Sequence, residues 1–170
     1  MTNRHAYLII AHNHWEQLKV LLQLLDDERN DIYLHIDKKS KEVDRNSLEN
    51  AVKSSTLYFV PQISVQWAGY SQVKCEMNLI EHALNEQYSY LHLLSGVDLP
   101  LKTQDEIHHF FEENEGKEFI QFNSSPMEER YLDRIKYYYL FQNIYGRKKN
   151  VLFWLEKISL KLQKILGLTS

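Results

Sequence analysis

Short apolar runs alternate with amphipathic segments along the chain. Strands are predicted by the apolar runs at residues 6–11, 31–37, 56–61, 88–94 and 117–122. After the first run, leucines recur at helical spacing and predict a helix with one apolar face: Leu18, Leu21, Leu22 and Leu25. A second helix is expected over 72–85, with these residues facing inward: Val73, Met77, Ile80 and Leu84. Strands that alternate with helices predict βαβ units and a doubly wound, mostly parallel α/β sheet.

The run at 88–94 ends abruptly in the sequence SGVDLPLKT. Gly96 would permit a close approach that a Cβ forbids, and Thr103 with Glu106 has the spacing of a capping box ahead of a helix over 103–114. Asp98 is therefore expected in the loop at the carboxyl end of a central strand, where open α/β sheets bind ligands. The alternative is that Asp98 only caps the turn at 100–103.

Polar residues also follow the first two predicted strands. Ala11, His12 and Asn13 follow the first strand, and Asp37, Lys38 and Lys39 follow the second. In a doubly wound sheet these loops and residues 95–98 meet at one edge, where an acidic group suits a ribose hydroxyl or a base edge of a nucleotide. The alternative is that such an Asp caps the next helix. The chain has neither G-x-G-x-x-G nor G-x-x-x-x-G-K-[ST], so the signatures of dinucleotide-binding dehydrogenases and P-loop kinases are absent.

Composition and charge narrow the function classes. The 170 residues are 44% hydrophobic with a formal net charge of -3, which fits a globular chain with a core and gives no reason to expect nucleic acid as a partner. Cys75 is the single cysteine, so an internal disulfide is impossible and a reducing compartment fits. The sequence lacks a signal-peptide pattern and an apolar run of membrane-spanning length, so a cytoplasmic location, peripheral to the inner membrane at most, is expected.

Histidine pairs raise the question of a metal. His12 and His14 form H-x-H, but no further ligands stand at zinc-site spacing, and the chain has no Asp-x-Asp to hold a divalent ion on a diphosphate. We therefore expect no metal and no other cofactor. His108 and His109 are expected on a solvated helix face, and His92 is expected to be a core histidine.

The C-terminal part differs from the rest. From residue 140 onward the chain contains six Lys or Arg residues and one acidic residue, Glu156. A helix expected over 151–166 carries an apolar stripe of Trp154, Leu155, Ile158, Leu162 and Ile165. We expect a domain over 1–136 and a basic amphipathic segment over 137–170 that leads to a missing C-terminal half. The stripe would pack on that half, pair with a second copy, or lie on an anionic membrane.

Four sequence blocks resemble one family in order and spacing. YLIIAHN, LHIDKKS, VQWAGYSQVKCEMNLIEHAL and YLHLLSGVDLPLKTQDEIHHFF, within residues 6–136, resemble the core-2/I-branching β-1,6-N-acetylglucosaminyltransferases and the related peptide O-xylosyltransferases. The resemblance implies a GT-A-like fold, represented here by its N-terminal part, and the absence of a membrane anchor and stem favours a bacterial member. It implies an inverting, metal-independent transfer of a sugar from a UDP-sugar, either N-acetylglucosamine or xylose, to a glycan or lipid-linked saccharide.

The resemblance also assigns roles to single positions. It implies donor contacts at Ala11, His12, Asn13, Asp37, Lys38, Lys39 and Trp67, a floor between donor and acceptor at Ser95, Gly96 and Asp98, and an acceptor contact at Arg130. Two family positions are changed, because Met127 replaces a lysine and the acidic acceptor contact falls near Gln121. The acceptor is therefore left open, and the family's catalytic glutamate is expected beyond Ser170. The alternative function is a non-catalytic module that binds a UDP-sugar or another protein.

Overall fold

The computed structural model describes residues 3–41, 43–66, 69–119, 136–145 and 149–169. The chain forms two compact units, a sheet unit of Met1–Val65 with Ser71–Gly116 and a helical unit of Gln66–Tyr70 with Lys117–Ser170. The boundary predicted after residue 136 stays a prediction, because it adjoins residues outside the described ranges.

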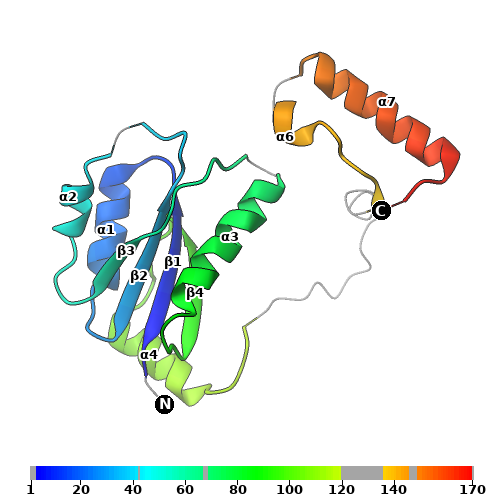
Figure 1. Ribbon diagram of the computed structural model, residues 1–170. Helices are drawn as coiled ribbons and strands as arrows, with labels where there is room; N and C mark the ends of the chain where they lie inside the picture. Colours follow the sequence, from blue (N-terminus) through cyan, green and yellow to red (C-terminus); the bar gives the residue numbers. More distant parts are fainter. Residues whose placement is uncertain (1–2, 42, 67–68, 120–135, 146–148, 170) are drawn as a thin grey trace. The chain divides into compact units, whose positions relative to one another are not determined.

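The sheet unit contains a parallel four-stranded sheet (Figure 1). Its strands are β1 (His5–Ala11), β2 (Asn30–Ile36), β3 (Thr56–Phe59) and β4 (Tyr90–Ser95), in the order β3-β2-β1-β4. Every pair is parallel, with Ala11 opposite Ile36 and Ile10 opposite Ser95 at the carboxyl end. The predicted α/β fold with a parallel sheet and flanking helices, consistent with a GT-A-like fold, is confirmed.

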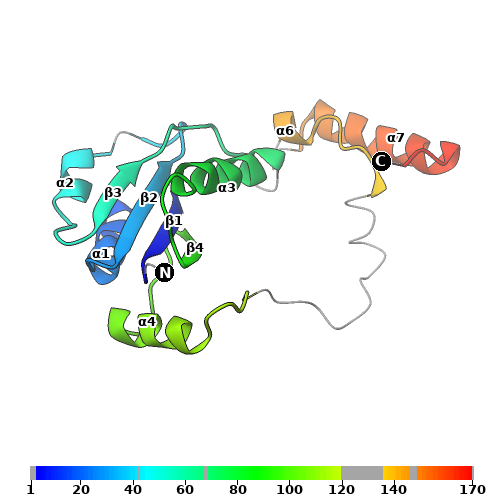
Figure 2. The same ribbon diagram turned by 60° about the horizontal axis from the view of Figure 1, so that its bottom comes forward.

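Helices cover both faces of this sheet. They are α1 (Trp15–Leu25), α2 (Arg45–Glu49), α3 (Tyr70–Ala83) and α4 (Gln104–Glu113). Buried leucines of α1 and α2 pack with one face of β1 and β2, and α3 packs on the other face with Ala6 and Leu8. Figure 2 shows α3 and α4 on opposite sides of the sheet. The predicted capping box is present, because Thr103 and Glu106 each accept a backbone N–H of the other.

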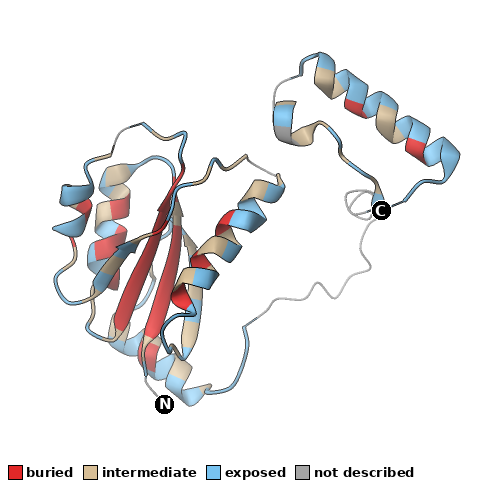
Figure 3. Ribbon diagram, in the orientation of Figure 1, coloured by how far each residue is buried: buried red, intermediate tan, exposed pale blue. Residues whose placement is uncertain are grey.

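Two predictions about these elements were wrong within the described residues, and a third is tested only in part. In the described sheet β4 is an edge strand whose residues alternate between half-buried and exposed, whereas β1 and β2 are buried (Figure 3). On α3 the buried residues are Cys75, Leu79 and Ala83. Of the predicted inward set, Ile80 packs against the core, whereas Val73, Met77 and Leu84 are exposed. Residues 117–119 form no strand, and the rest of that predicted strand lies outside the described residues.

His108 also contradicts the sequence prediction. It is buried, its ring stacks on His5 with centroids 4.0 Å apart, and its Nε2 lies 2.9 Å from Asn30 Oδ1. His109 is exposed, as expected, and lies beside Glu113. His92 joins the cluster through a 3.1 Å contact between its Nε2 and His5 Nδ1. Burial and the neighbouring histidines lower the pKa of His5 to about 3 and that of His92 to about 4, so both rings are neutral at pH 7.

The helical unit contains α6 (Gln142–Tyr145) and α7 (Val151–Leu166). Two buried polar side chains of α7 fix the preceding segment: Glu156 accepts the N–H groups of Leu140 and Phe141, and Gln163 bonds both the N–H and the C=O of Tyr138. The predicted apolar stripe is on the exposed side of α7. Among the described residues no helix is long and apolar enough to cross a bilayer.

Candidate functional site

The order of the strands defines a switch point in the sheet. From β1 the chain proceeds to β2 and β3 on one side, and returns through α3 to β4 on the other side of β1. The loops that follow β1 and β4 leave adjacent strands at the carboxyl edge and lead to α1 and α4, which contact each other on one face of the sheet. Open α/β sheets bind their ligands in the crevice formed at such a point. This edge, which carries residues 11–14, 37–40, 61–65 and 95–98, is the candidate site.

Gly96 brings the loops after β1 and β4 into close contact. Its N–H donates to the C=O of Ile10 over 2.9 Å. A Cβ on Gly96 would lie 2.7 Å from Ala11 Cβ and 3.2 Å from Ala11 Cα, which is closer than side chains pack. The close approach expected for this glycine is therefore present, and Gly96 and Ala11 are both buried where the two loops meet.

Asp98 closes a turn at the end of β4. Its Oδ2 accepts the N–H of Ser95 over 2.8 Å, and its own N–H donates to the C=O of Ser95 over 3.0 Å. The side chain of Gln17, from α1, holds the C=O of Val97. Asp98 is exposed and closes the turn at 95–98, while the helix that begins at Gln104 is capped by Thr103. The alternative that Asp98 caps the 100–103 turn is therefore wrong.

The loop after β2 is tied to the loop after β1. The N–H of Asp37 donates to the C=O of Ala11 over 2.9 Å, and the hydroxyl of Ser40 donates to the C=O of His12 over 3.0 Å. Asp37 is only 8% exposed, and its Oδ1 accepts the N–H of Lys39 over 2.9 Å. Among the described residues, Oδ2 pairs with the Lys39 ammonium at 3.9 Å. One oxygen of Asp37 thus supports the backbone, and Oδ2 is the oxygen with capacity for a ligand.

A segment after β3 completes the edge. The C=O of Ile63 accepts the N–H of Lys38 over 3.1 Å, and the N–H of Ile63 donates to Nε2 of His35 over 3.0 Å. The N–H of Val65 donates to Asp37 Oδ1 over 3.4 Å, and the Lys39 ammonium donates to the C=O of Val65. Sequence reasoning missed His35 and residues 61–65. The available signal was a histidine two positions before Asp37 inside an otherwise apolar strand.

The accessible groups at this edge are polar, and Lys38 and Lys39 carry positive charge beside the carboxylates of Asp37 and Asp98. His12, Asn13, Lys38 and Lys39 are exposed around the buried Asp37. Such an edge offers hydrogen-bond donors and positive charge to an anionic ligand, with one carboxylate oxygen for a hydroxyl or N–H. The structure thus brings together nine of the predicted residues: Ala11, His12, Asn13, Asp37, Lys38, Lys39, Ser95, Gly96 and Asp98. Trp67 and Arg130 lie outside the described residues.

Within the described ranges no group of three His, Cys, Asp or Glu side chains could hold a metal, and His12 and His14 have no third ligand there. An acidic pocket of about 640 Å³ lies at the opposite edge, lined by Asp26, Asp27, Glu28, Arg29, Ser54 and Asp105.

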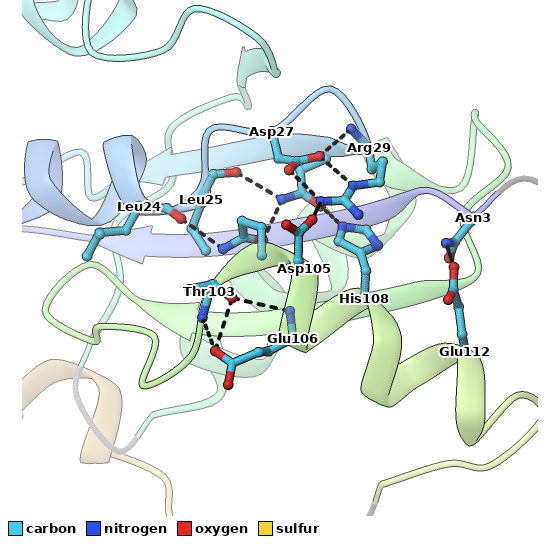
Figure 4. Close-up of polar contacts among 12 residues, drawn as sticks. Asn3, Leu24, Leu25, Asp27, Arg29, Thr103, Asp105, Glu106, His108 and Glu112 are labelled. Atoms are coloured by element: carbon cyan, nitrogen blue, oxygen red, sulfur yellow. Dashed lines mark hydrogen bonds and ion pairs between the residues drawn. The ribbon is translucent and has the colours of Figure 1, made fainter.

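Three of the four carboxylates of this pocket, those of Asp26, Asp27 and Asp105, accept hydrogen bonds. Arg29 donates to Asp27 and Asp105, while Asp26 accepts the N–H groups of residues 53–55 (Figure 4 shows the Arg29 contacts). The same figure shows that α4 is held here by further contacts, including His108 and the Asn3–Glu112 pair. These bonds account for the pocket as a structural junction.

Comparison with known proteins identifies one family and several relatives. The model of the Core-2/I-Branching enzyme family matches residues 5–164. Xylosyltransferase 2 of Canis lupus familiaris is 28% identical over 141 residues, which cover 78% of this chain and 16% of that protein. The Mus musculus beta-1,3-galactosyl-O-glycosyl-glycoprotein beta-1,6-N-acetylglucosaminyltransferase 3 is 26% identical over 138 residues, which cover 79% of this chain and 31% of that protein. The chain spans less than a third of the length of either relative.

Proposed function

This chain belongs to the Core-2/I-branching enzyme family, and from that premise we propose that it is the nucleotide-sugar-binding part of an inverting, metal-independent glycosyltransferase. The donor is a UDP-sugar, with N-acetylglucosamine as the first candidate and xylose as the second. The names of the two relatives, an N-acetylglucosaminyltransferase and a xylosyltransferase, support these two candidates. The acceptor is a glycan or a lipid-linked saccharide.

The observation that carries this proposal is the joined edge at the switch point. The two predicted donor loops, at 11–13 and 37–39, and the predicted floor at 95–98 are linked there by direct hydrogen bonds or close packing. Asp37 Oδ2 would accept a hydrogen bond from a ribose hydroxyl or from the N–H of the base. Lys38 and Lys39 would contribute positive charge near the diphosphate.

Metal independence is part of the same proposal. The sequence contains no Asp-x-Asp to bridge a divalent ion to the diphosphate, so cationic side chains of the complete enzyme would balance the leaving-group charge. Inversion requires one general base to activate the acceptor hydroxyl, and the glutamate expected for this role would lie beyond Ser170. The donor site can therefore be tested in this chain without requiring turnover.

Calorimetry with UDP, UDP-N-acetylglucosamine and UDP-xylose is the direct experiment. Asp37→Asn is the sharpest variant, because the amide oxygen can still accept the N–H groups of Lys39 and Val65 while the second oxygen is lost. We expect this change to weaken UDP binding by about 1–3 kcal/mol, the effect of a lost hydrogen bond to a charged group.

Asp26→Asn is the matched control. Asp26 also accepts backbone N–H groups, those of Lys53, Ser54 and Ser55, but it does so at the opposite edge. This control should lower stability and leave UDP affinity unchanged. A folded chain that binds no UDP at millimolar concentration would refute the donor site and favour a protein-interaction module. Equal affinities in the wild type and Asp37→Asn would restrict Asp37 to supporting the loops.

A further inference from the structure

His35 is a buried polar residue beneath the candidate donor edge. It lies in β2, is fully buried, and its Nε2 accepts the N–H of Ile63 over 3.0 Å. A backbone N–H can only donate, so Nε2 must be unprotonated and His35 must be the neutral tautomer with its proton on Nδ1. Burial favours this state by lowering the pKa of His35, while the nearby Asp37 carboxylate acts in the opposite direction.

The segment held by His35 has left the sheet. The last bond in line with the β2–β3 pairing joins the N–H of Val60 to the C=O of Leu34 over 3.1 Å. Beyond it, residues 61–65 depend on contacts with β2 and its loop, supplemented by a 3.3 Å bond from Asn78 to the C=O of Pro61. His35 and Asp37 are two positions apart, so both side chains point to the same face and can replace the missing ladder.

The contacts form a chain that ends at the donor loop. His35 fixes Ile63, whose C=O accepts the N–H of Lys38. Two residues further, Val65 donates to Asp37 and accepts from the Lys39 ammonium. The positions of the Asp37 carboxylate and the Lys39 ammonium, which the proposed function assigns to the donor, therefore depend on a segment that His35 anchors.

We propose that His35 is a positioning residue of the donor site, which uses a neutral ring nitrogen to hold residues 61–65 against the Asp37–Lys39 loop. This inference rests on the proposed function. It differs from a general role in the core because it predicts a local effect on one segment and one loop. The role depends on the hydrogen-bond acceptor at Nε2 and not on the volume of the ring.

Two substitutions separate acceptor from volume. His35→Gln places an amide oxygen at about the reach of Nε2, and His35→Leu fills similar space without an acceptor. Leu25→Ala is the control for stability loss alone, because Leu25 is fully buried at the far end of α1. Amide hydrogen exchange at Ile63 and Val65 reports the anchor, and calorimetry with UDP reports the site.

We expect His35→Leu to speed exchange at both amides and to weaken UDP binding about tenfold, the effect of one hydrogen bond. His35→Gln should restore both to within about threefold of the wild type, and Leu25→Ala should leave UDP affinity unchanged. If His35→Leu does not fold, His35→Asn replaces it, since its shorter amide mimics Nδ1 and does not reach Ile63.

The outcomes distinguish this inference from the proposed function. Wild-type chain that is folded but binds no UDP overturns the proposed function and the positioning role with it. Wild-type chain that binds UDP, together with His35→Leu or His35→Asn of equal affinity, overturns the positioning role alone. Equal loss in His35→Gln and His35→Leu also overturns it, because the acceptor would then not matter.

Discussion

Gly96→Ala tests the close contact between the loops after β1 and β4. The added Cβ would lie 2.7 Å from Ala11 Cβ, about 1 Å short of ordinary carbon contact. Overpacking of this kind costs about 1–3 kcal/mol. Gly96 does not have a positive φ, so the loss of unfolded-chain entropy returns about 0.4–1 kcal/mol. The net expectation is a decrease of about 1–2 kcal/mol in the free energy of unfolding, measured by urea denaturation.

A double-mutant cycle with Ala11→Gly identifies the cause. Removing Ala11 Cβ removes the nearest atom, so Gly96→Ala should cost less in the Ala11→Gly background, with a coupling of at least about 0.5 kcal/mol. Gly116→Ala is the control, because Gly116 has φ +77 and no heavy atom within 4 Å of an added Cβ. Its cost comes from the backbone conformation and should be independent of Ala11.

Close contact between Gly96 and Ala11 would be contradicted if the two substitutions changed the free energy of unfolding additively. If Gly96→Ala is as stable as the wild type, or equally costly in both backgrounds, the two loops are not in the close contact described. If the proposed donor site is also correct, Gly96→Ala should weaken UDP binding, because the loops after β1 and β4 would be forced apart.

Other predictions concern acid, the helical unit and metal. The pKa values of His5 (about 3) and His92 (about 4) lie below the usual 6.5, so at acidic pH the unfolded chain binds more protons than the folded chain. The free energy of unfolding, measured by urea titrations, should therefore fall as pH decreases from about 6.5 to about 4. Trp154 and Ile158 are 62% and 56% exposed, so the chain should self-associate through this stripe. Sedimentation velocity should show self-association of the wild type and its loss when Trp154→Glu and Ile158→Glu are combined. Salt-sensitive flotation with anionic vesicles would instead assign the stripe to a membrane. Activity of the complete enzyme should survive EDTA; a strict manganese requirement would contradict the proposal.

The elements of the sheet unit were predictable because their signals are local. Each strand is a short apolar run, and the inward face of α1 follows from leucines three and four residues apart. The capping box at Thr103 needs only residues 103–106. The convergence of the strand-end loops followed from the parallel topology that alternating strands and helices imply.

The face of α3 could not be predicted in the same way. Its apolar residues occupy two sides, and one side is chosen because Leu79 and Ala83 meet Ala6 and Leu8 from a distant part of the chain. His108 was misplaced for a related reason: its burial depends on Asn30 and His5, neither of which is near it in sequence.

At the candidate site, the residue types that end the strands can be read from the sequence: the carboxylate Asp37, the adjacent lysines and the small Gly96. Their roles depend on the fold. It puts one Asp37 oxygen on backbone N–H groups, presses Gly96 against Ala11, and makes His35 the anchor of residues 61–65. The physical reason is that a side chain's spare hydrogen-bonding capacity depends on groups that reach it from other loops, and sequence patterns describe only neighbours along the chain.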